Sequence, residues 1–340
     1  MTNSFFTVDV HNHILPEHLP DFKKQFGYGG FVTLKNTNSG ADMMMDDGSF
    51  FRAIEHNCLN TEVRLEQMSK LGIDVQVLST IPVMFSYWAK PTDCNDVCSY
   101  LNDDLAKRVE AHPKNLLGIG SLPLMDTQLS ILQAKNIKSL GLSGIQIGSH
   151  VGEMNLDDEK LFPLYEELEN LDLPLLVHPW DMMGADTMSK YWLPWLVGMP
   201  AEGSRAISSM IFGGVFDKFP KLRVMFAHAG GSFLGTLGRI DHAYHSRPDL
   251  CAVNIKKAPS EYLKHFYIDS ITHDEDALHY AIKKMSVDRI ALGSDFPFPL
   301  GEHHPGELIK TVNSLTDAQK ERLLSGTALE WLGIKKERFN

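Results

Sequence analysis

The feature that most constrains the fold is a regular alternation of short apolar runs with longer amphipathic segments. Eight runs have the length and apolar content of buried strands, and they are 5–10, 75–80, 116–122, 144–148, 173–178, 223–228, 266–270 and 289–295. Segments with helical spacing alternate with them, at 62–71, 93–111, 127–140, 157–171, 202–216, 232–245, 274–285 and 316–332. This alternation predicts an α/β fold, a (β/α)8 TIM barrel.

Two stretches depart from the alternation, and each follows a predicted strand. Residues 14–60 separate the first strand from its helix and include a glycine-rich turn at 27–30 and an extended-looking run at 31–34. A connection of this length usually carries function, so we predict a small β-rich insertion near the active-site mouth. Residues 179–200, rich in Met and Trp, follow the fifth strand. The whole chain, 1–340, is expected to form one barrel domain.

Composition narrows the class of partner. The formal net charge of −11 argues against non-specific attraction to nucleic acid or to an anionic membrane. No stretch approaches the ~18 uninterrupted apolar residues of a membrane span, and residues 1–4 lack the features of a signal peptide. We therefore expect a cytoplasmic protein that binds neither nucleic acid nor a membrane.

The cysteines give no metal or disulfide framework. Cys94 and Cys98 are four residues apart on one helical face, which could be half of a zinc site, but no second pair at zinc-finger spacing accompanies them. We expect reduced thiols with a structural role.

Possible metal ligands lie at the ends of three predicted strands. His11 and His13 are two residues apart, so on an extended strand both side chains point to the same side. His178 and Asp295 end the fifth and eighth strands, and the carboxyl ends of barrel strands meet at one face. An isolated H-x-H pair is equally consistent with ordinary histidines, whereas four convergent ligands favour a site for zinc or a similar ion.

His228 ends the sixth strand, between the strands of the other candidates. It could be a further ligand, a core histidine bonded to backbone, or a general base. We favour the base, because four protein ligands and a water already fill a five-coordinate site. The fourth strand ends in 148–149, Gly-Ser, without a lysine that could bridge two metals, which favours one ion. The roles of three more histidines stay open: His150, His303 and His304.

Five longer motifs resemble the 2-amino-3-carboxymuconate-6-semialdehyde decarboxylases, zinc-dependent members of the amidohydrolase superfamily. They are IPVMFSYW at 81–88, GIQIG at 144–148, HPWDMM at 178–183, WLPWLVGMPAE at 192–202 and LGSDFPFPLGE at 292–302. The resemblance extends from Val8 to about Leu332. It implies an amidohydrolase-type barrel and a non-oxidative decarboxylase.

The resemblance also implies the composition of the site. One Zn²⁺ per subunit would be bound by His11, His13, His178 and Asp295, with His228 as the base that activates water at the metal. The residues themselves are consistent with this set, since all four ligand types are intact here.

The substrate that the resemblance implies is a dicarboxylate semialdehyde held by arginines. Arg52 lies on the insertion, Arg239 would reach across from the other subunit of a homodimer, and Arg247 would lie near that interface. Guanidinium groups bind carboxylates bidentately and keep their charge, although most arginines form weak surface pairs. The apolar pocket residues implied in the same way are Trp192, Phe51, Met182 and Phe298.

The reaction so implied converts 2-amino-3-carboxymuconate 6-semialdehyde to 2-aminomuconate 6-semialdehyde and CO2, in tryptophan–kynurenine or nitrobenzoate-type catabolism. The sequence leaves open whether water addition or protonation comes first. It also leaves alternatives: a hydrolase or lactonase with the same site, or an aromatic-acid decarboxylase, whose usual first motif has Glu where His11 stands. A binding protein with a structural metal is a third alternative, against which the nearby His228 argues.

Overall fold

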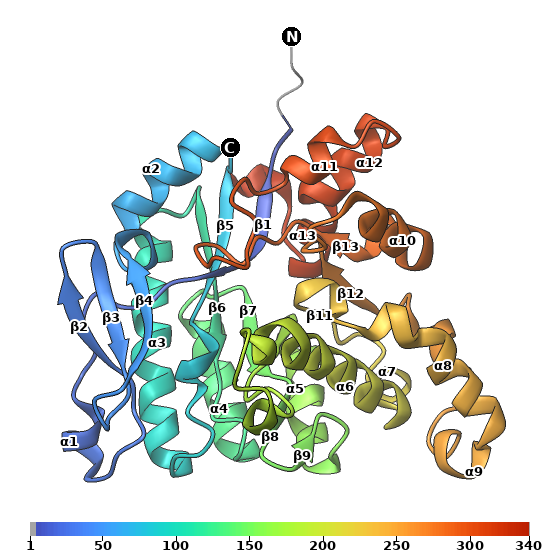
Figure 1. Cartoon of the computed structure of the whole chain (residues 1–340), viewed down its shortest axis with the longest axis horizontal. Coiled ribbons are helices and arrows are strands. Elements are labelled where there is room, and N and C mark those ends of the chain that lie inside the picture. The colour runs from blue at the N-terminus through green and yellow to red at the C-terminus, as the bar shows by residue number, and fades with distance from the viewer. Residues whose placement is uncertain (1–4, 340) are drawn as a thin grey trace.

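The computed structural model describes residues 5–339, and eight parallel strands form its centre (Figure 1). In spatial order they are β1 (Val8–His13), β5 (Val75–Ser79), β6 (Leu116–Ser121), β7 (Gly144–Gly148), β10 (Leu175–His178), β11 (Val224–Phe226), β12 (Phe266–Asp269) and β13 (Ile290–Ala291). Each strand pairs with the next one in this order, always parallel. The predicted (β/α)8 barrel is confirmed.

The barrel closes between its first and last strands. Val10 N donates a 2.9 Å hydrogen bond to Leu292 O, and His13 N donates a 2.8 Å bond to Phe296 O. β13 has only two residues, so the closing contacts come mostly from residues 292–296 that follow it. We call this junction of β1 with residues 290–296 the seam.

Apolar side chains from seven barrel strands form one buried cluster with the C-terminal helix α13 (Thr327–Leu332). The cluster contains Val8, Val10, Val75, Val77, Leu117, Ile119, Leu176, Met225, Tyr267, Ala291, Ala328, Trp331 and Leu332. Alternate residues of the same strands, except those of β1, pack in a second cluster with the other helices. Burial on both faces explains why the strands appear in the sequence as continuous apolar runs.

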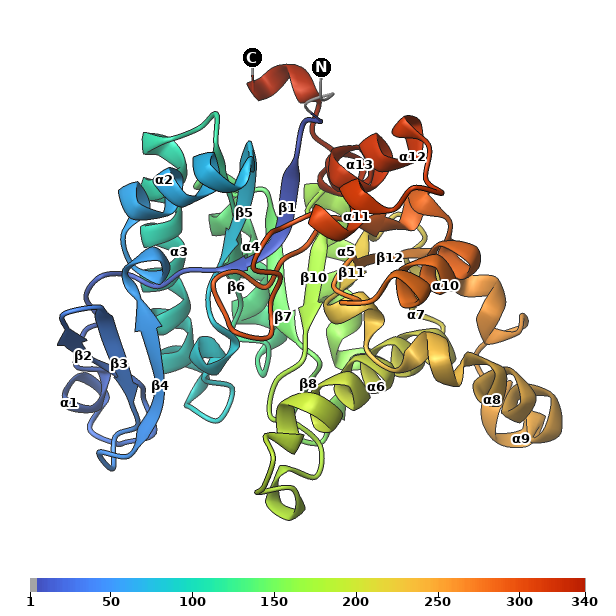
Figure 2. The same cartoon turned by 45° about the horizontal axis from the view of Figure 1, so that its top comes forward.

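Helices cover the outside of the barrel (Figures 1 and 2). The longer ones are α2 (Thr61–Leu71), α3 (Pro91–Ala111), α4 (Thr127–Ser139), α5 (Phe162–Leu171), α6 (Met199–Phe212), α8 (Phe233–Ser246) and α10 (Glu275–Met285). Side chains that accept a hydrogen bond from the first turn cap several of them, as Asn60 does for Val63 N and Asp126 for Leu129 N. Shorter helices are α7 (Val215–Lys218), α9 (Pro248–Cys251), α11 (Glu307–Thr311) and α12 (Asp317–Glu321).

Several element boundaries differ from the sequence-based expectation. α5 begins at Phe162 rather than at 157, because Pro163 lacks an N–H and is tolerated only in the first turn. The helix expected at 202–216 is interrupted after Phe212, where Gly214 adopts φ +71°. The eighth strand is shorter than 289–295, since Asp295 turns out of the extended conformation at φ +55°. β1 runs on to His13, which places both histidines of the first motif on the strand.

The predicted β-rich insertion is a three-stranded antiparallel sheet at one side of the barrel (Figures 1 and 2). It consists of β2 (Thr33–Thr37), β3 (Gly40–Met44) and β4 (Phe50–Glu55), preceded by α1 (Phe22–Phe26). Tyr28 Oη donates a 2.7 Å hydrogen bond to Asp93 Oδ2 and so fastens the insertion to α3. A second small sheet, the hairpin of β8 (His150–Val151) and β9 (Met154–Asn155), follows β7.

Two other expectations concern the chain as a whole. No helix within residues 5–339 is long and apolar enough to cross a bilayer. Residues 1–4, on which the expectation about a signal peptide rested, lie outside the described residues. Cys94 and Cys98 are buried free thiols on α3, in agreement with a structural role.

Candidate metal centre

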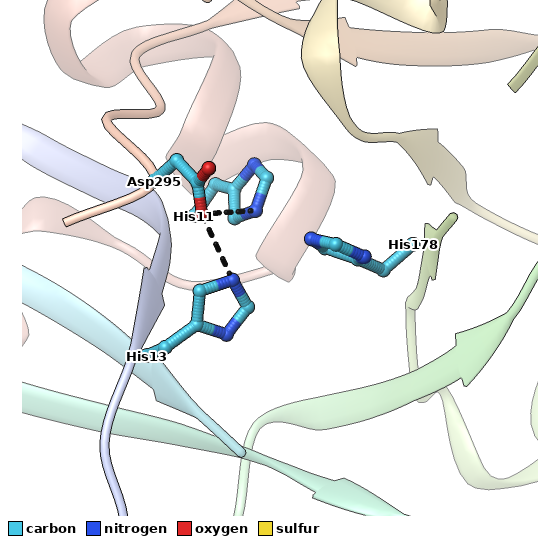
Figure 3. Close-up of side chains that lie close together, drawn as sticks. All are labelled: His11, His13, His178 and Asp295. Carbon is cyan, nitrogen blue, oxygen red and sulfur yellow. Dashed lines mark ion pairs between the residues drawn. The ribbon is translucent and has the colours of Figure 1, made fainter. Parts of the chain in front are cut away.

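The structure brings the four proposed ligands together at the carboxyl end of the barrel. One ligand atom each of His11, His13, His178 and Asp295 lies within 4.8 Å of the others, and all four residues are buried. Figure 3 shows the carboxylate of Asp295 between the rings of His11 and His13, with His178 reaching toward them from β10. These residues are distant in sequence, and their convergence follows from the parallel closure of the sheet.

A bulge in β1 sets the direction of the first two histidines. Asp9 pairs with Gln76 and Asn12 with Leu78, so two residues of β1 stand opposite one residue of β5. Such a bulge re-aims side chains locally. After it the strand resumes its register, and the rings of His11 and His13 lie edge to face at 5.2 Å.

The three histidines present the same nitrogen to the centre. Each Nδ1 has an oxygen acceptor: Asp269 Oδ2 at 2.7 Å from His11, Thr80 O at 2.9 Å from His13, and Pro179 O at 2.7 Å from His178. These partners assign the proton to Nδ1 and leave the lone pair on Nε2. The three Nε2 atoms are buried without a hydrogen-bond partner.

Those lone pairs face a carboxylate. Asp295 Oδ1 lies 3.1 Å from His13 Nε2 and 3.6 Å from His11 Nε2. Two electron-rich groups this close repel each other unless a cation or a proton lies between them. Three nitrogens and one oxygen are a donor set that suits Zn²⁺ and neighbouring divalent ions, so the residues present fit a metal ion.

The surroundings also favour the protonation states that metal ligands need. Burial, reinforced by the nearby charge of His228, lowers the pKa of His178 well below its usual value. Burial raises the pKa of Asp295, but the electrostatic influence of the neighbouring imidazoles of His13, His228 and His11 outweighs it and brings this pKa well below the usual range. Neutral imidazole and ionised carboxylate are the forms that bind a divalent ion. In His11 burial is outweighed by the bond to Asp269, which raises its pKa; a bound ion would compete with that proton.

His228 lies beside the four proposed ligands, and its ring forms no hydrogen bond with them. Its Nε2 is 3.6 Å from Asp295 Oδ2, and its ring centroid is 4.9 Å from that of His178. Neither ring nitrogen has a hydrogen-bond partner within residues 5–339, whereas each ligand histidine has its Nδ1 bonded. Residue 228 begins a turn with φ +56°, so the backbone directs this ring back toward the centre.

Asp269 is a site residue that the sequence-based interpretation missed. Besides the His11 ring, its carboxylate accepts hydrogen bonds from His228 N and Ala229 N, both at 2.7 Å. The one side chain therefore orients a ligand and holds the turn that carries His228. The available signal was its position, because Asp269 ends the seventh barrel strand as the other site residues end theirs.

Arg64 is a second residue that the interpretation missed. It is fully buried beneath the metal centre, donates to His13 O and donates a 2.9 Å hydrogen bond to Gln76 Oε1. Burial lowers its pKa to about 10. On α2 it follows no pattern that distinguishes it from a surface arginine, so nothing in the sequence alone indicated this role.

A pocket of about 320 Å³ opens beside the metal centre. His13, His178 and Asp295 form part of its lining. The four apolar residues implied by the resemblance also line it: Phe51, Met182, Trp192 and Phe298. The pocket is therefore apolar on its walls and polar at the metal ligands, as small-molecule sites commonly are.

Arg52, on β4 of the insertion, is the arginine that reaches this pocket. Its guanidinium lies over the ring of Phe298 at 4.3 Å, and it forms no hydrogen bond or ion pair with residues 5–339. Burial lowers its pKa, and the charge of Asp295 partly opposes that effect. A half-buried guanidinium without a protein partner is well placed to bind an anion.

Arg239 and Arg247 do not line the pocket of their own chain. Both are exposed, Arg239 on α8 and Arg247 directly after it, and Arg247 pairs with Asp249 at 2.7 Å. A role of Arg239 in the site would need a second subunit. His303 and His304 are exposed, and His150 is buried against Glu202.

Comparison with known proteins agrees with this architecture. The sequence model of the Amidohydrolase family matches residues 8–334. A 2-amino-3-carboxymuconate-6-semialdehyde decarboxylase of Dictyostelium discoideum is 50% identical over 98% of this chain and 93% of the relative. The Caenorhabditis elegans protein of the same name is 37% identical over 96% and 94%.

Solved structures with the same fold are more distant in sequence. The 5-carboxyvanillate decarboxylase of Sphingomonas paucimobilis matches with a TM-score of 0.82 at 21% identity, over 98% of this chain and all of that one. A manganese-bound 5-carboxyvanillate decarboxylase of Novosphingobium aromaticivorans matches with a TM-score of 0.81 at 21% identity, over 97% and 96%. Together with the family match, the near full-length identity shows that this chain belongs to the amidohydrolase superfamily and, within it, to the family of the 2-amino-3-carboxymuconate-6-semialdehyde decarboxylases.

Proposed function

We propose that this chain is a carboxy-lyase that converts 2-amino-3-carboxymuconate 6-semialdehyde to 2-aminomuconate 6-semialdehyde and CO2, in tryptophan–kynurenine or nitrobenzoate-type catabolism. The observation that carries the proposal is one apolar pocket lined both by three members of the four-residue centre, His13, His178 and Asp295, and by the unpartnered Arg52. The names of the two most similar relatives reported above support the choice of substrate.

His11, His13, His178 and Asp295 would hold one Zn²⁺ per subunit, because three imidazole nitrogens and a carboxylate match its preferences. The ion supplies Lewis acidity, which makes water at the site much more acidic than in bulk. Elemental analysis of the purified protein is expected to find one zinc per chain. Activity restored by manganese but not by zinc would contradict this choice of metal.

His228 is proposed to move the protons of the reaction. Its free ring nitrogen accepts a proton from water at the site and later returns it to the carbon that has lost the carboxylate, while the hydroxide that is left takes up a proton from solvent and becomes water again. The carbon–carbon bond breaks with its electron pair left on the substrate carbon, CO2 departs, and the returned proton takes its place. The conjugated chain of the substrate spreads that pair, so no oxidant is needed.

Arg52 would bind a substrate carboxylate and thereby fix the orientation of the molecule in the pocket. Phe298 supports the guanidinium from below, and Trp192 and Met182 offer flat or adaptable apolar surfaces to a planar conjugated ligand. These contacts position and dehydrate the substrate, while the proton transfers depend on His228.

We further infer a homodimer in which Arg239 of one subunit reaches the pocket of the other. In its own chain this side chain is exposed and forms no hydrogen bond or ion pair with residues 5–339. Apolar side chains are exposed nearby in sequence, with Leu250 64% and Val253 66% accessible. Sedimentation over a dilution series with parallel assays tests this, and a fully active monomer would contradict it.

The reaction itself is tested by incubating the zinc-loaded protein with the semialdehyde while CO2 release and product mass are measured. γ-Resorcylate, 5-carboxyvanillate and a panel of lactones serve as competing substrates. We expect CO2 from the semialdehyde at a kcat/KM far above that of any competitor. Preferential decarboxylation of an aromatic acid, or ring opening of a lactone, would replace the proposal with the corresponding alternative.

A further inference from the structure

Glu202 is a fully buried carboxylate outside the metal centre, in the first turn of α6. Its Oε2 accepts a 2.9 Å hydrogen bond from Ser149 Oγ and lies 2.9 Å from His150 Nδ1. Its Oε1 accepts a bond of 3.2 Å from Met183 N and lies 3.4 Å from Arg205 Nη1. A buried charge persists only with such partners, and these partners come from three separate segments of the chain.

The carboxylate is ionised in this environment. Burial raises the pKa of Glu202, but the hydrogen bond and charge of His150 outweigh that effect, and the net result is a pKa below the usual value. Charge-assisted hydrogen bonds are stronger and shorter than neutral ones. The contact with Met183 N, at 3.2 Å, is therefore charge-assisted.

Met183 belongs to residues 179–198, which we call the wall segment. The wall segment contributes a large part of the pocket lining, including Trp180, Met182 and Trp192. Residues 181–198 continue into α6 through helical hydrogen bonds. Apart from these, and within the described part of the chain, they form one hydrogen bond with a residue outside the segment, from Met183 N to Glu202. Residues 181–198 thus depend on Glu202 for their polar attachment to the barrel.

The side chains around Glu202 also hold the start of the wall segment, at Trp180. Trp180 Nε1 donates a 3.0 Å hydrogen bond to the carbonyl of His150, whose ring faces Glu202. The indole lies against Gly148 at the end of β7, where an added Cβ would come within 2.8 Å of Trp180 Cδ1. His150, which the sequence left without a role, therefore links the carboxylate of Glu202 to a pocket-lining ring.

We propose that Glu202, through His150 and Met183, is a positioning residue that fixes the wall segment at the distance from the metal ligands that a flat conjugated dicarboxylate requires. It contacts neither the pocket nor the metal ligands, so it sets how well substrate is bound and leaves the chemical step to His228. The identity of the substrate in this proposal rests on the proposed function. The attachment of the wall segment by Glu202 is independent of that function.

The test compares zinc-loaded wild type with Glu202→Gln, which keeps the size of the side chain and removes its charge. The amide places an N–H donor against donors, so the wall segment should spend more time detached. If the wall segment is ordered a tenth of the time, the apparent affinity for substrate falls about tenfold, because only the ordered fraction of the protein binds it. KM then rises by about the same factor. We expect kcat to change less than about threefold and the metal content to stay at one ion per chain.

Hydrogen exchange measured by mass spectrometry without substrate gives a readout that does not depend on activity. Peptides covering 179–198 should exchange faster in Glu202→Gln, while peptides covering β1 and residues 290–296 keep the wild-type rate. A fall in overall stability alone would raise exchange in all of them. Glu166→Gln, on the exposed side of α5, is the matched control and should leave both kinetics and exchange unchanged.

Gly198→Ala disturbs the same wall from its other side without altering any charge. An added Cβ there would lie 3.0 Å from Met182 Cβ, and the helical φ of −64° accommodates alanine. We expect it to reproduce the rise in KM, so the proposal stays testable if Glu202→Gln does not fold. Two results would overturn the positioning role. One is unchanged hydrogen exchange in residues 179–198, and the other is faster exchange there with an unchanged KM. A wild type that exchanges as described but releases no CO2 refutes the proposed function alone.

Discussion

The Nδ1 atom of His11 lies 2.7 Å from Oδ2 of Asp269, and neither side chain is exposed to solvent. The same carboxylate accepts hydrogen bonds from the backbone of His228 and Ala229. A proposed metal ligand and the turn that bears the proposed base are thus held by one group. Their relative position depends on a residue that contacts neither the pocket nor the ion.

Replacement of Asp269 by Asn should weaken metal binding. The amide keeps the shape of the side chain but loses the charge that orients His11 and raises its basicity, and such second-layer changes typically reduce metal affinity about 10- to 100-fold. Competition with a chromogenic chelator measures the change. Asp276→Asn, at an exposed position of α10, is the control. An unaltered affinity would show that the His11–Asp269 contact does not tune the site.

Replacement of His228 by Ala should separate metal binding from turnover. We expect one zinc per chain to remain and kcat to fall by about 10²- to 10⁴-fold, the usual contribution of a general acid–base group. His303→Ala, on the exposed loop after β13, should behave as wild type. Loss of zinc in His228→Ala would make this residue a ligand, and full activity would remove it from the mechanism.

Arg52 should act on substrate binding through the shape of its head group as well as its charge. A hydrogen bond between charged groups contributes about 1.5–3 kcal/mol, which corresponds to about 10- to 100-fold in affinity. We expect KM to rise about tenfold in Arg52→Lys, which keeps the charge without the planar fork, and further in Arg52→Gln. Steady-state kinetics on the semialdehyde measure both. A wild-type KM in Arg52→Lys would reduce the role of Arg52 to charge alone, and equally raised KM values in the two variants would show that its charge does not matter.

Glu302 should make the metal-free protein less stable as the pH rises. Burial raises its pKa from 4.5 to about 7, partly opposed by the bond from Gly306 N. Between these values the folded state binds more protons than the unfolded state, so the free energy of unfolding falls as pH increases. The full effect is of the order of 3 kcal/mol. This loss of stability is absent below pH 4.5 and complete above pH 7.

Glu302→Gln carries no ionisable group and should flatten this dependence, because Gln can still accept from Gly306 N. Urea unfolding of the chelated protein from pH 5 to pH 8 compares the two chains. We expect the variant to be the more stable chain at pH 8 and nearly equal to wild type at pH 5. A stability gap that does not change with pH would contradict the assignment to this carboxyl group.

The barrel could be predicted because its strands are buried on both faces and so appear as apolar runs. The predicted ends of helices and strands were wrong where a single residue overrode the hydrophobic periodicity. Pro163 delayed the start of α5, and Gly214 separated α6 from α7. The eighth strand was expected to reach Asp295, but its pairing with β1 continues through irregular backbone after Ala291.

The proposed ligands could be found because parallel strands deliver their last residues to one face of the sheet. Asp269 obeys the same rule and could have been included. Arg64 and Glu202 could not be found in this way, since a charged residue on an amphipathic helix is normally on its solvent face. Their burial depends on contacts with β1 and with the wall segment, which are made only when distant parts of the chain meet.

The seam gives the metal centre a mechanical consequence. His11 and His13 lie on β1, and Asp295 lies in the stretch whose backbone pairs with β1 to close the ring. An ion held by these three side chains cross-links the first strand to the last at the one junction where strand pairing is shortest. Without the ion, the junction would be held by hydrogen bonds such as those of Val10 N and His13 N, so it would open more often. Exchange at the amide of Asp295, which is bonded to His11 O at 2.7 Å, should therefore be faster in the metal-free protein.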